Sequence, residues 1–312
     1  MSARSEALPA VVPDRRKFLG GSDIAAILGI SPWKTGVDLW LDKITPPRED
    51  GHNAGAKRRG NRLEPYIVDM IREEHGLDIV RRGERYVDSE VPFFAAEIDA
   101  ETQLPSRSIA EPGAIENIEI KTVHPFKAKE WGMEDTDELP LHYVAQVQWG
   151  LGVTRRKVCR VYALIGDDLK PYVVERDDET IAALRARAGA FWTDFVLPRI
   201  RPPLDFGNSK TLDTLRRLYP GTDGSTVQAT AMHEHWRAVL ATAQDMAAKY
   251  QGVIDGARAH LMAEMGAAAL LQFDDGRAFR RKEVKKKAHT VAYPASRYMD
   301  FRLINHDKDE PQ

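Results

Sequence analysis

The chain has 312 residues, of which 43% are hydrophobic and 29% charged, and its formal net charge is −2. At about 150 residues per domain this length predicts about two domains, and the composition excludes a chain that is disordered throughout. The nearly balanced charge excludes nucleic-acid binding driven by bulk electrostatics, and the single Cys159 excludes a disulfide framework or a site built from several thiolates. The N-terminus lacks the apolar stretch of a signal peptide and no segment is apolar enough for a membrane span, so we expect a cytoplasmic protein without membrane contact.

Short helices are predicted at the start of the chain. After an aperiodic segment over residues 1–13, Gly20 and Gly21 allow a turn, and Ser22 is a suitable N-cap for a short helix. A second helix is predicted over residues 37–44.

A third helix is predicted over residues 61–75 from apolar residues at three- and four-residue spacing. Pro65 favours the first turn of a helix, so Glu64 is expected at the start of this one. Runs of β-forming residues, broken by Gly, Pro and Asp, follow it. They predict strands at 79–80, 85–87, 93–98, 115–120, 157–165 and 172–175, with a helix within 142–150.

The C-terminal part of the chain has a different organisation. An amphipathic helix over 178–197 is expected to complete a core spanning residues 14–203, and residues 204–230 are predicted to be a linker. A long helix is predicted over 231–265, because apolar residues recur at alternating spacings of four and three, as in a heptad repeat. These seam residues are Trp236, Leu240, Ala243, Ala247, Tyr250, Ile254, Ala257 and Leu261. The seam suits packing within the chain or self-association. A β-hairpin is predicted over 270–273 and 278–284, and together with the long helix it forms a unit over 231–304. Residues 305–312 are predicted to be a polar tail.

The chemically informative pattern is Asp99 followed by Glu119-Ile120-Lys121. Residues i and i+2 of a strand share a face, so Glu119 and Lys121 project together and an Asp on a neighbouring strand can meet them. Two carboxylates and the Ile120 carbonyl are hard oxygen ligands suited to Mg²⁺ or Mn²⁺, with Lys121 beside the bound water. By itself this pattern is weak evidence for a metal site, because an exposed strand edge with solvated charged side chains has the same sequence pattern.

Neighbouring residues strengthen the metal-site hypothesis. Glu64 can add a third carboxylate from the helix that precedes the strands. Tyr143 and Gln146 share a helix face at i,i+3, so a buried Gln146 can reach a metal-bound water or a phosphate. The alternative for Gln146 is an ordinary polar helix position.

Five motifs in order resemble the YqaJ-like viral recombinase family, relatives of phage lambda exonuclease: GGSDIAAILGISPWK, GNRLEP, AEIDA, EIKT and HYVAQVQWGLGVT. The resemblance runs from about Arg15 to about Pro203. It implies an α/β (α+β) fold of the PD-(D/E)-x-K, restriction-endonuclease-like type, a mixed central sheet flanked by helices, with the long C-terminal helix and hairpin as an appendage. It also implies a metal-dependent alkaline exonuclease that digests duplex DNA from 5′ ends and leaves a 3′ strand for a single-strand annealing protein.

The resemblance also implies roles for individual residues. Asp99, Glu119 and the Ile120 carbonyl match metal ligands, and Glu64 matches the carboxylate near a second Mg²⁺ or Mn²⁺ ion. The catalytic set comprises Asp99, Glu119, Lys121, Gln146 and Tyr143, and the residues expected to bind DNA or its 5′-phosphate are Ser22, Arg15, Arg16 and Gln148. A ring-shaped homotrimer in the cytoplasm of a bacterium or a phage-infected host is the assembly that the family suggests.

One departure from the family leaves other functions open. Members usually carry Pro and Gly on either side of the acidic residue, whereas this chain has Ile98-Asp99-Ala100. A DNA-end-binding protein with a decayed site and a nicking or site-specific endonuclease on the same fold are therefore alternatives. A third is an interaction module based on the heptad seam, and the basic stretch Lys282–Lys287 can contact DNA backbone instead.

Overall fold

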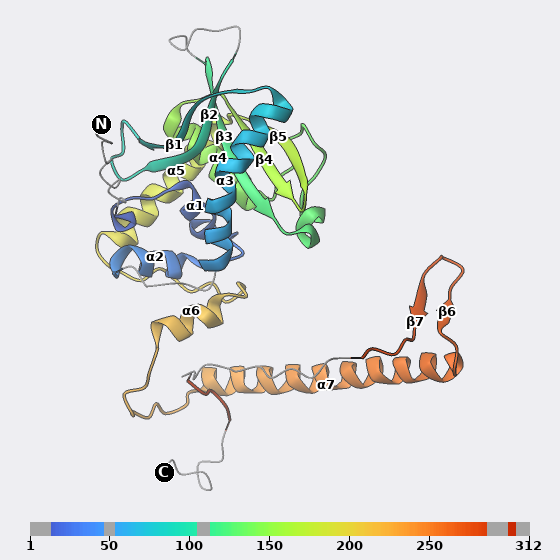
Figure 1. Ribbon diagram of the computed structural model, residues 1–312. Coiled ribbons are helices and arrows are strands. Elements are labelled where there is room, and N and C mark those ends of the chain that lie inside the picture. The colour runs from blue at the N-terminus through green and yellow to red at the C-terminus, as the bar shows by residue number, and fades with distance from the viewer. Residues whose placement is uncertain (1–13, 47–53, 105–112, 286–298, 304–312) are drawn as a thin grey trace, which may run out of the picture. The chain divides into compact units, whose positions relative to one another are not determined.

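The computed structural model describes residues 14–46, 54–104, 113–285 and 299–303 (Figure 1). The chain divides into two compact units, Met1–Leu218 and Tyr219–Gln312. The predicted N-terminal segment, the polar tail and Lys286-Lys287 lie outside the described residues. None of the helices in the described ranges has both the length and the apolar character needed to cross a membrane.

A five-stranded mixed sheet forms the centre of the first unit, with the strand order β1-β2-β3-β4-β5 (Figure 1). The β3–β4 pair is parallel and the other three pairs are antiparallel. The strands are β1 (Asp78–Val87), β2 (Ala95–Gln103), β3 (Ile115–Val123), β4 (Val158–Ile165) and β5 (Asp168–Glu175). A mixed central sheet flanked by helices was predicted and is confirmed.

Helices cover both faces of the sheet. Ile118 and Ile120 of β3 pack against apolar residues of α3 (Ala54–His75), among them Ile67 and Ile71. The alternate residues of β3 point the other way, toward α4 (Leu141–Thr154), where Asn117 Nδ2 donates to Thr154 Oγ1 at 3.0 Å. The remaining helical elements of this unit are η1 (Arg15–Lys17), α1 (Gly21–Ile27), α2 (Gly36–Ile44), η2 (Pro125–Glu130), α5 (Asp178–Phe191), the π-helical η3 (Trp192–Val196) and α6 (Thr211–Leu218).

Two local predictions were wrong. Helix α3 begins at Ala54, so Pro65 lies inside the helix and Glu64 is an interior residue rather than the first one. Proline removes one backbone donor from a helix, and here the carbonyl that loses its partner belongs to exposed Asn61, where water can replace it. Ser22 is not the N-cap of α1: Gly20 occupies that position, and its backbone N donates to Asp23 at 3.1 Å.

The segment after α5 is partly anchored to the first unit. Thr214 of α6 is fully buried, and its hydroxyl donates to Asp38 of α2 at 2.6 Å and lies 3.0 Å from the hydroxyl of Thr35. Residues 204–218 therefore belong to the first unit, although the sequence assigns them to the linker.

The second unit consists of a long helix and a small hairpin. Helix α7 (Ala231–Met265) has the predicted bounds, and β6 (Leu270–Gln272) pairs with β7 (Ala278–Arg280), which is shorter than the predicted strand. Among the described residues of this unit only Met265 is buried, so most of the apolar surface of α7 is exposed.

Candidate active site

Strands β2 and β3 stop pairing next to the predicted catalytic residues. Their ladder runs from Gln103–Ile115 to Ala100–Ile118. In a continued ladder Ile120 would face Ile98, but the Ile120 backbone N instead donates to Asp99 Oδ2 at 2.7 Å. The side chain of Asp99 thus replaces a strand as the hydrogen-bond partner, which fixes its carboxylate at the edge of β3.

Glu119 accepts two hydrogen bonds on the α4 side of β3. Gln146 Nε2 donates to Glu119 Oε1 at 2.6 Å, and Lys121 Nζ is ion-paired with the same oxygen. The Lys121 ammonium also lies 5.1 Å from the centre of the Tyr143 ring, a cation–π contact. The predicted sharing of a face by Glu119 and Lys121, and by Tyr143 and Gln146, is therefore what brings these four side chains together.

The carboxyl groups of the site repel one another in a buried setting. Burial, and then the nearby charge of Glu119, raises the pKa of Asp99 to about 8, against a partial offset from Lys121. Burial and the charge of Glu119 also raise the pKa of Glu64, which places this α3 residue within electrostatic reach of the site. Burial alone would lower the pKa of Lys121, but the carboxylates of Glu119 and Asp99 outweigh burial and raise it.

These residues fit a divalent cation by the chemistry of their donors. Crowded carboxylates with raised pKa values are the groups that a cation stabilises, and carboxylate and carbonyl oxygens are ligands that Mg²⁺ and Mn²⁺ prefer. In the described part of the chain no three His, Cys, Asp or Glu side chains converge closely enough to form a complete ligand set. Asp99 and Glu119 thus offer two carboxylates, and further ligands of an ion there would have to be backbone carbonyl or water oxygens.

A second polar cluster adjoins the site through α1. Arg15 Nη2 donates to Ser22 Oγ at 3.1 Å, and Arg15 Nη1 donates to Glu97 Oε2 at 3.0 Å. The Gly21 backbone lies so close to Gln146 that a Cβ there would be 3.1 Å from Gln146 Cγ. Ser22, the partner of Arg15, thus follows directly in the chain on the glycine that lies close to Gln146, whereas Arg16 is bound on the surface to its neighbour Asp14.

A buried ion pair beneath this cluster was missed in the sequence. Asp23 is 2% exposed, and its carboxylate accepts from Lys43 Nζ at 2.7 Å and from Lys34 Nζ at 3.0 Å. Lys43 also donates to the backbone carbonyls of Arg15 and Phe18, at 2.8 and 2.6 Å. Asp23 and Lys43 thereby fix the turn that carries Arg15. No sequence signal identifies Lys43, because lysines at helix ends are usually solvated.

Gln148 does not join the site. It is 4% exposed, its Nε2 donates to the Glu175 carbonyl at 2.7 Å, and its Oε1 accepts from Asp177 N at 3.0 Å. Its amide thus connects α4 to the β5–α5 turn, and neither polar atom is free for DNA. The structure thus gives Gln148 a structural role, and its DNA-binding role stays a prediction.

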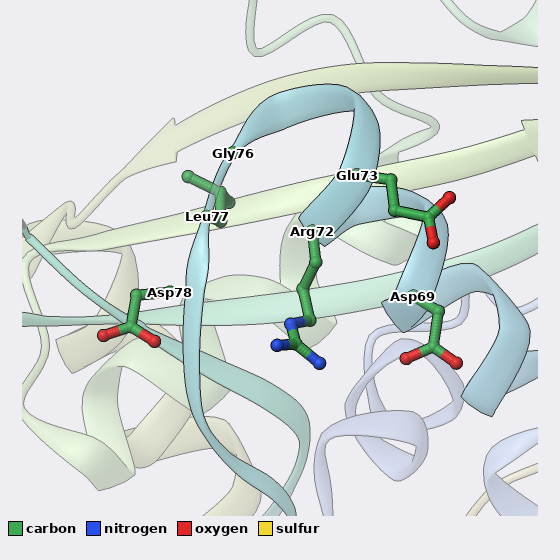
Figure 2. Close-up of a pocket in the computed structure, with 6 residues that line it drawn as sticks. All are labelled: Asp69, Arg72, Glu73, Gly76, Leu77 and Asp78. Carbon is green, nitrogen blue, oxygen red and sulfur yellow. The ribbon is translucent and has the colours of Figure 1, made fainter.

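A surface hollow at the end of α3 is separate from these residues (Figure 2). It has a volume of about 530 Å³ and is lined by Asp69, Arg72, Glu73, Gly76, Leu77 and Asp78. Arg82 Nη2 donates to Asp69 at 3.0 Å, so one of the lining carboxylates already has a partner. None of the predicted site residues lines this hollow.

Comparison with known proteins finds a family match within the first unit. Residues 12–157 match the YqaJ-like viral recombinase domain, which confirms the resemblance drawn from the sequence motifs. A Bacillus subtilis (strain 168) protein, "Uncharacterized protein YqaJ", is 33% identical over 215 residues, which cover 68% of this chain and 63% of that protein. The match thus spans slightly less than two thirds of the relative's length.

Solved structures of exonucleases share a lower similarity. An alkaline exonuclease from Laribacter hongkongensis is 19% identical, with a TM-score of 0.46 over 60% of this chain and 91% of its own. The same exonuclease in complex with dAMP gives a TM-score of 0.44 at 19% identity, over 65% of this chain and 94% of its own. A phage-related exonuclease from Haemophilus somnus 129PT gives 0.39 at 17% identity, over 56% and 92%.

Proposed function

Because residues 12–157 match the YqaJ-like viral recombinase domain, we propose that the chain is a divalent-metal-dependent exonuclease that digests linear duplex DNA from 5′ ends. One observation carries this proposal: Asp99 is bonded to the β3 backbone where β2 and β3 separate, within electrostatic reach of the Glu119–Lys121 ion pair. Acidic ligands beside a buried ammonium suit hydrolysis of a phosphate ester, whose developing negative charge needs cations around it.

Asp99, Glu119 and the Ile120 carbonyl would hold the ion, with Glu64 toward a second one. Bound there, Mg²⁺ or Mn²⁺ supplies activation of the attacking water and stabilisation of the leaving oxygen. Lys121 balances the charge of Glu119 when the pocket holds no ion, and its ammonium is placed to orient the water or to offset charge on the phosphate. Gln146 keeps the Glu119 carboxylate in position through its amide.

The Arg15–Ser22 pair suits a terminal 5′-phosphate. The guanidinium and the hydroxyl already contact each other, and an anion can replace that contact by accepting from both. Glu97 competes for Arg15, so a doubly charged phosphate is needed to draw the guanidinium away. These features support a preference for 5′-phosphorylated ends over 5′-hydroxyl ends.

The test is degradation of linear, 5′-phosphorylated duplex DNA in Mg²⁺, with label at either end to give the polarity. Lys121→Ala and Asp99→Ala should each lose at least about 100-fold in rate, since removal of one charge-stabilising group costs that much in other enzymes. Lys170→Ala is the matched control, because this β5 lysine is partly exposed and ion-paired with Glu134. Equal rates in all four proteins would refute the assignment.

The same assay separates the alternatives. A DNA-end-binding protein would retain duplex ends but release no nucleotide with any divalent ion. An endonuclease would cut covalently closed circles, which a 5′ exonuclease leaves intact. The ring-shaped trimer and the annealing-protein partner are tested by light scattering and by co-purification with an annealing protein.

A further inference from the structure

We infer that Trp33 forms a stacking platform for an unpaired nucleobase at the end of the DNA substrate. The inference rests on the proposed function, because it takes DNA to be the molecule that reaches Lys121. It adds a base-binding subsite to a site that otherwise recognises phosphate.

Trp33 is an exposed aromatic residue connected to the catalytic lysine by ring contacts. It lies in the loop between α1 and α2, and its residue surface is 51% exposed. Its ring centre lies 6.0 Å from that of Tyr143, which lies 5.1 Å from Lys121 Nζ. The indole is therefore within about 11 Å of the ammonium, at most about three nucleotides at the roughly 3.4 Å per nucleotide of one strand.

The ring is held in place by its surroundings. The ring planes of Trp33 and His142 are nearly perpendicular, at 89°, with their centres 4.9 Å apart. The backbone is fixed as well, because the hydroxyl of buried Ser31 accepts from Trp33 N at 3.2 Å and from Lys34 N at 3.3 Å. Since the loop and the ring are already ordered, a ligand that stacks on Trp33 loses little affinity to ordering it.

A nucleobase is the ligand that matches this surface. Every base has a π-face, and stacking on an aromatic side chain tolerates any sequence, which suits an enzyme that must process all of them. A terminal nucleotide that leaves its stack on the way to the site loses base stacking, which an aromatic platform replaces. Covering a half-exposed indole removes apolar surface from water, which adds to the gain.

The experiment uses 5′-phosphorylated duplex DNA that carries 2-aminopurine at the terminal or the second position of the 5′ strand. All proteins carry Lys121→Ala in addition, so that DNA is bound in Mg²⁺ but not cut. Binding should quench the probe in the Lys121→Ala protein. Trp33→Ala should abolish most of the quenching and weaken binding roughly 5- to 150-fold, the range found for loss of one base–aromatic stack. Trp33→Phe should restore most of both.

Trp236→Ala is the matched control, since Trp236 is 61% exposed and lies on α7 in the other unit. Its quenching and affinity should equal those of the Lys121→Ala protein. Unchanged quenching and affinity in Trp33→Ala would overturn the inference, and so would a Trp33→Ala protein that differs only in oligomeric state, which would make Trp33 a contact between copies. If the proposed function is wrong but Trp33 does bind a base, the quenching will depend on Trp33 while the wild-type protein releases no nucleotide.

Discussion

Gly21 is where α1 comes closest to the catalytic face of α4. A Cβ at this position would lie 3.1 Å from Gln146 Cγ and 3.3 Å from the Gln146 carbonyl oxygen. The carbonyl belongs to the backbone of α4 and cannot rotate away. Gly21→Ala therefore separates the two helices by a few tenths of an ångström or displaces the Gln146 side chain that holds Glu119.

The expected effect on activity is larger than the effect on stability. Overpacking costs about 1–3 kcal/mol, while alanine in place of glycine in a helix regains up to about 1 kcal/mol, which gives a net destabilisation of about 0–2 kcal/mol. A hydrogen bond to a charged group contributes about 1.5–3 kcal/mol. If about half of that is lost between Gln146 and Glu119, the rate of DNA degradation falls about 3- to 15-fold.

The assay is single-turnover degradation of 5′-phosphorylated duplex DNA, with chemical denaturation to measure stability. Gly152→Ala is the control: it lies on α4, the helix of Gln146, but its Cβ would be 2.9 Å from Ile181 Cγ2. By the same balance it should destabilise the protein by about 0–2 kcal/mol and leave the rate per folded molecule within about twofold. A Gly21→Ala protein as active as the wild type, or a Gly152→Ala protein that is equally slow, would refute the role of Gln146.

Three further outcomes follow from the buried polar groups. Lys43→Met leaves Asp23 without its buried partner and should lower the free energy of unfolding by about 3–5 kcal/mol. The loss should lie at the lower end of this range, because Lys34 remains paired with Asp23. A change below about 1 kcal/mol in urea denaturation would contradict this. Gln148→Ala should lower stability by about 1–3 kcal/mol but leave the Kd for DNA unchanged, which fluorescence anisotropy can measure. Because the pKa of Asp99 is raised to about 8, the folded protein holds a proton on this carboxyl group at pH 7. Binding of Mg²⁺ must displace this proton, so the affinity for Mg²⁺ should increase as the pH rises toward 8. Calorimetry in buffers of different ionisation enthalpy should detect the released proton, and its persistence in Asp99→Asn would contradict the assignment.

The alternation of side chains along a strand was enough to predict the centre of the site. Glu119 and Lys121 are two residues apart in β3, and this period places both on the α4 side whatever the rest of the fold does. Tyr143 and Gln146 follow from the helical period in the same way. Rules of this kind depend only on residues close together in the chain, so they hold in the folded protein whatever its tertiary contacts.

The positions that the sequence did not predict depend on contacts between distant segments. Lys43 is buried because Asp23 and two carbonyls from a turn more than 20 residues earlier surround its ammonium, and no local pattern distinguishes it from a solvated lysine. Gln148 lies two residues from Gln146 on the same helix, yet both the nitrogen and the oxygen of its amide are hydrogen-bonded to the β5–α5 turn. In each case the partner is supplied by tertiary structure.

The residues on either side of Asp99 show how the departure from the family motif is accommodated. Ala100 is fully buried, with its methyl group in the cluster that joins α3 to the sheet, and Ile98 packs in the core on which Trp149 of α4 lies. A glycine at position 100 would leave a methyl-sized space there, so the side chains present fill the sheet–helix contacts. Asp99 meanwhile keeps its bond to the Ile120 backbone, which depends on the separation of β2 from β3 rather than on its neighbours in the chain. The side chains at positions 98 and 100 thus take part in core packing and leave the Asp99 carboxylate at the edge of β3, as the proposed function requires.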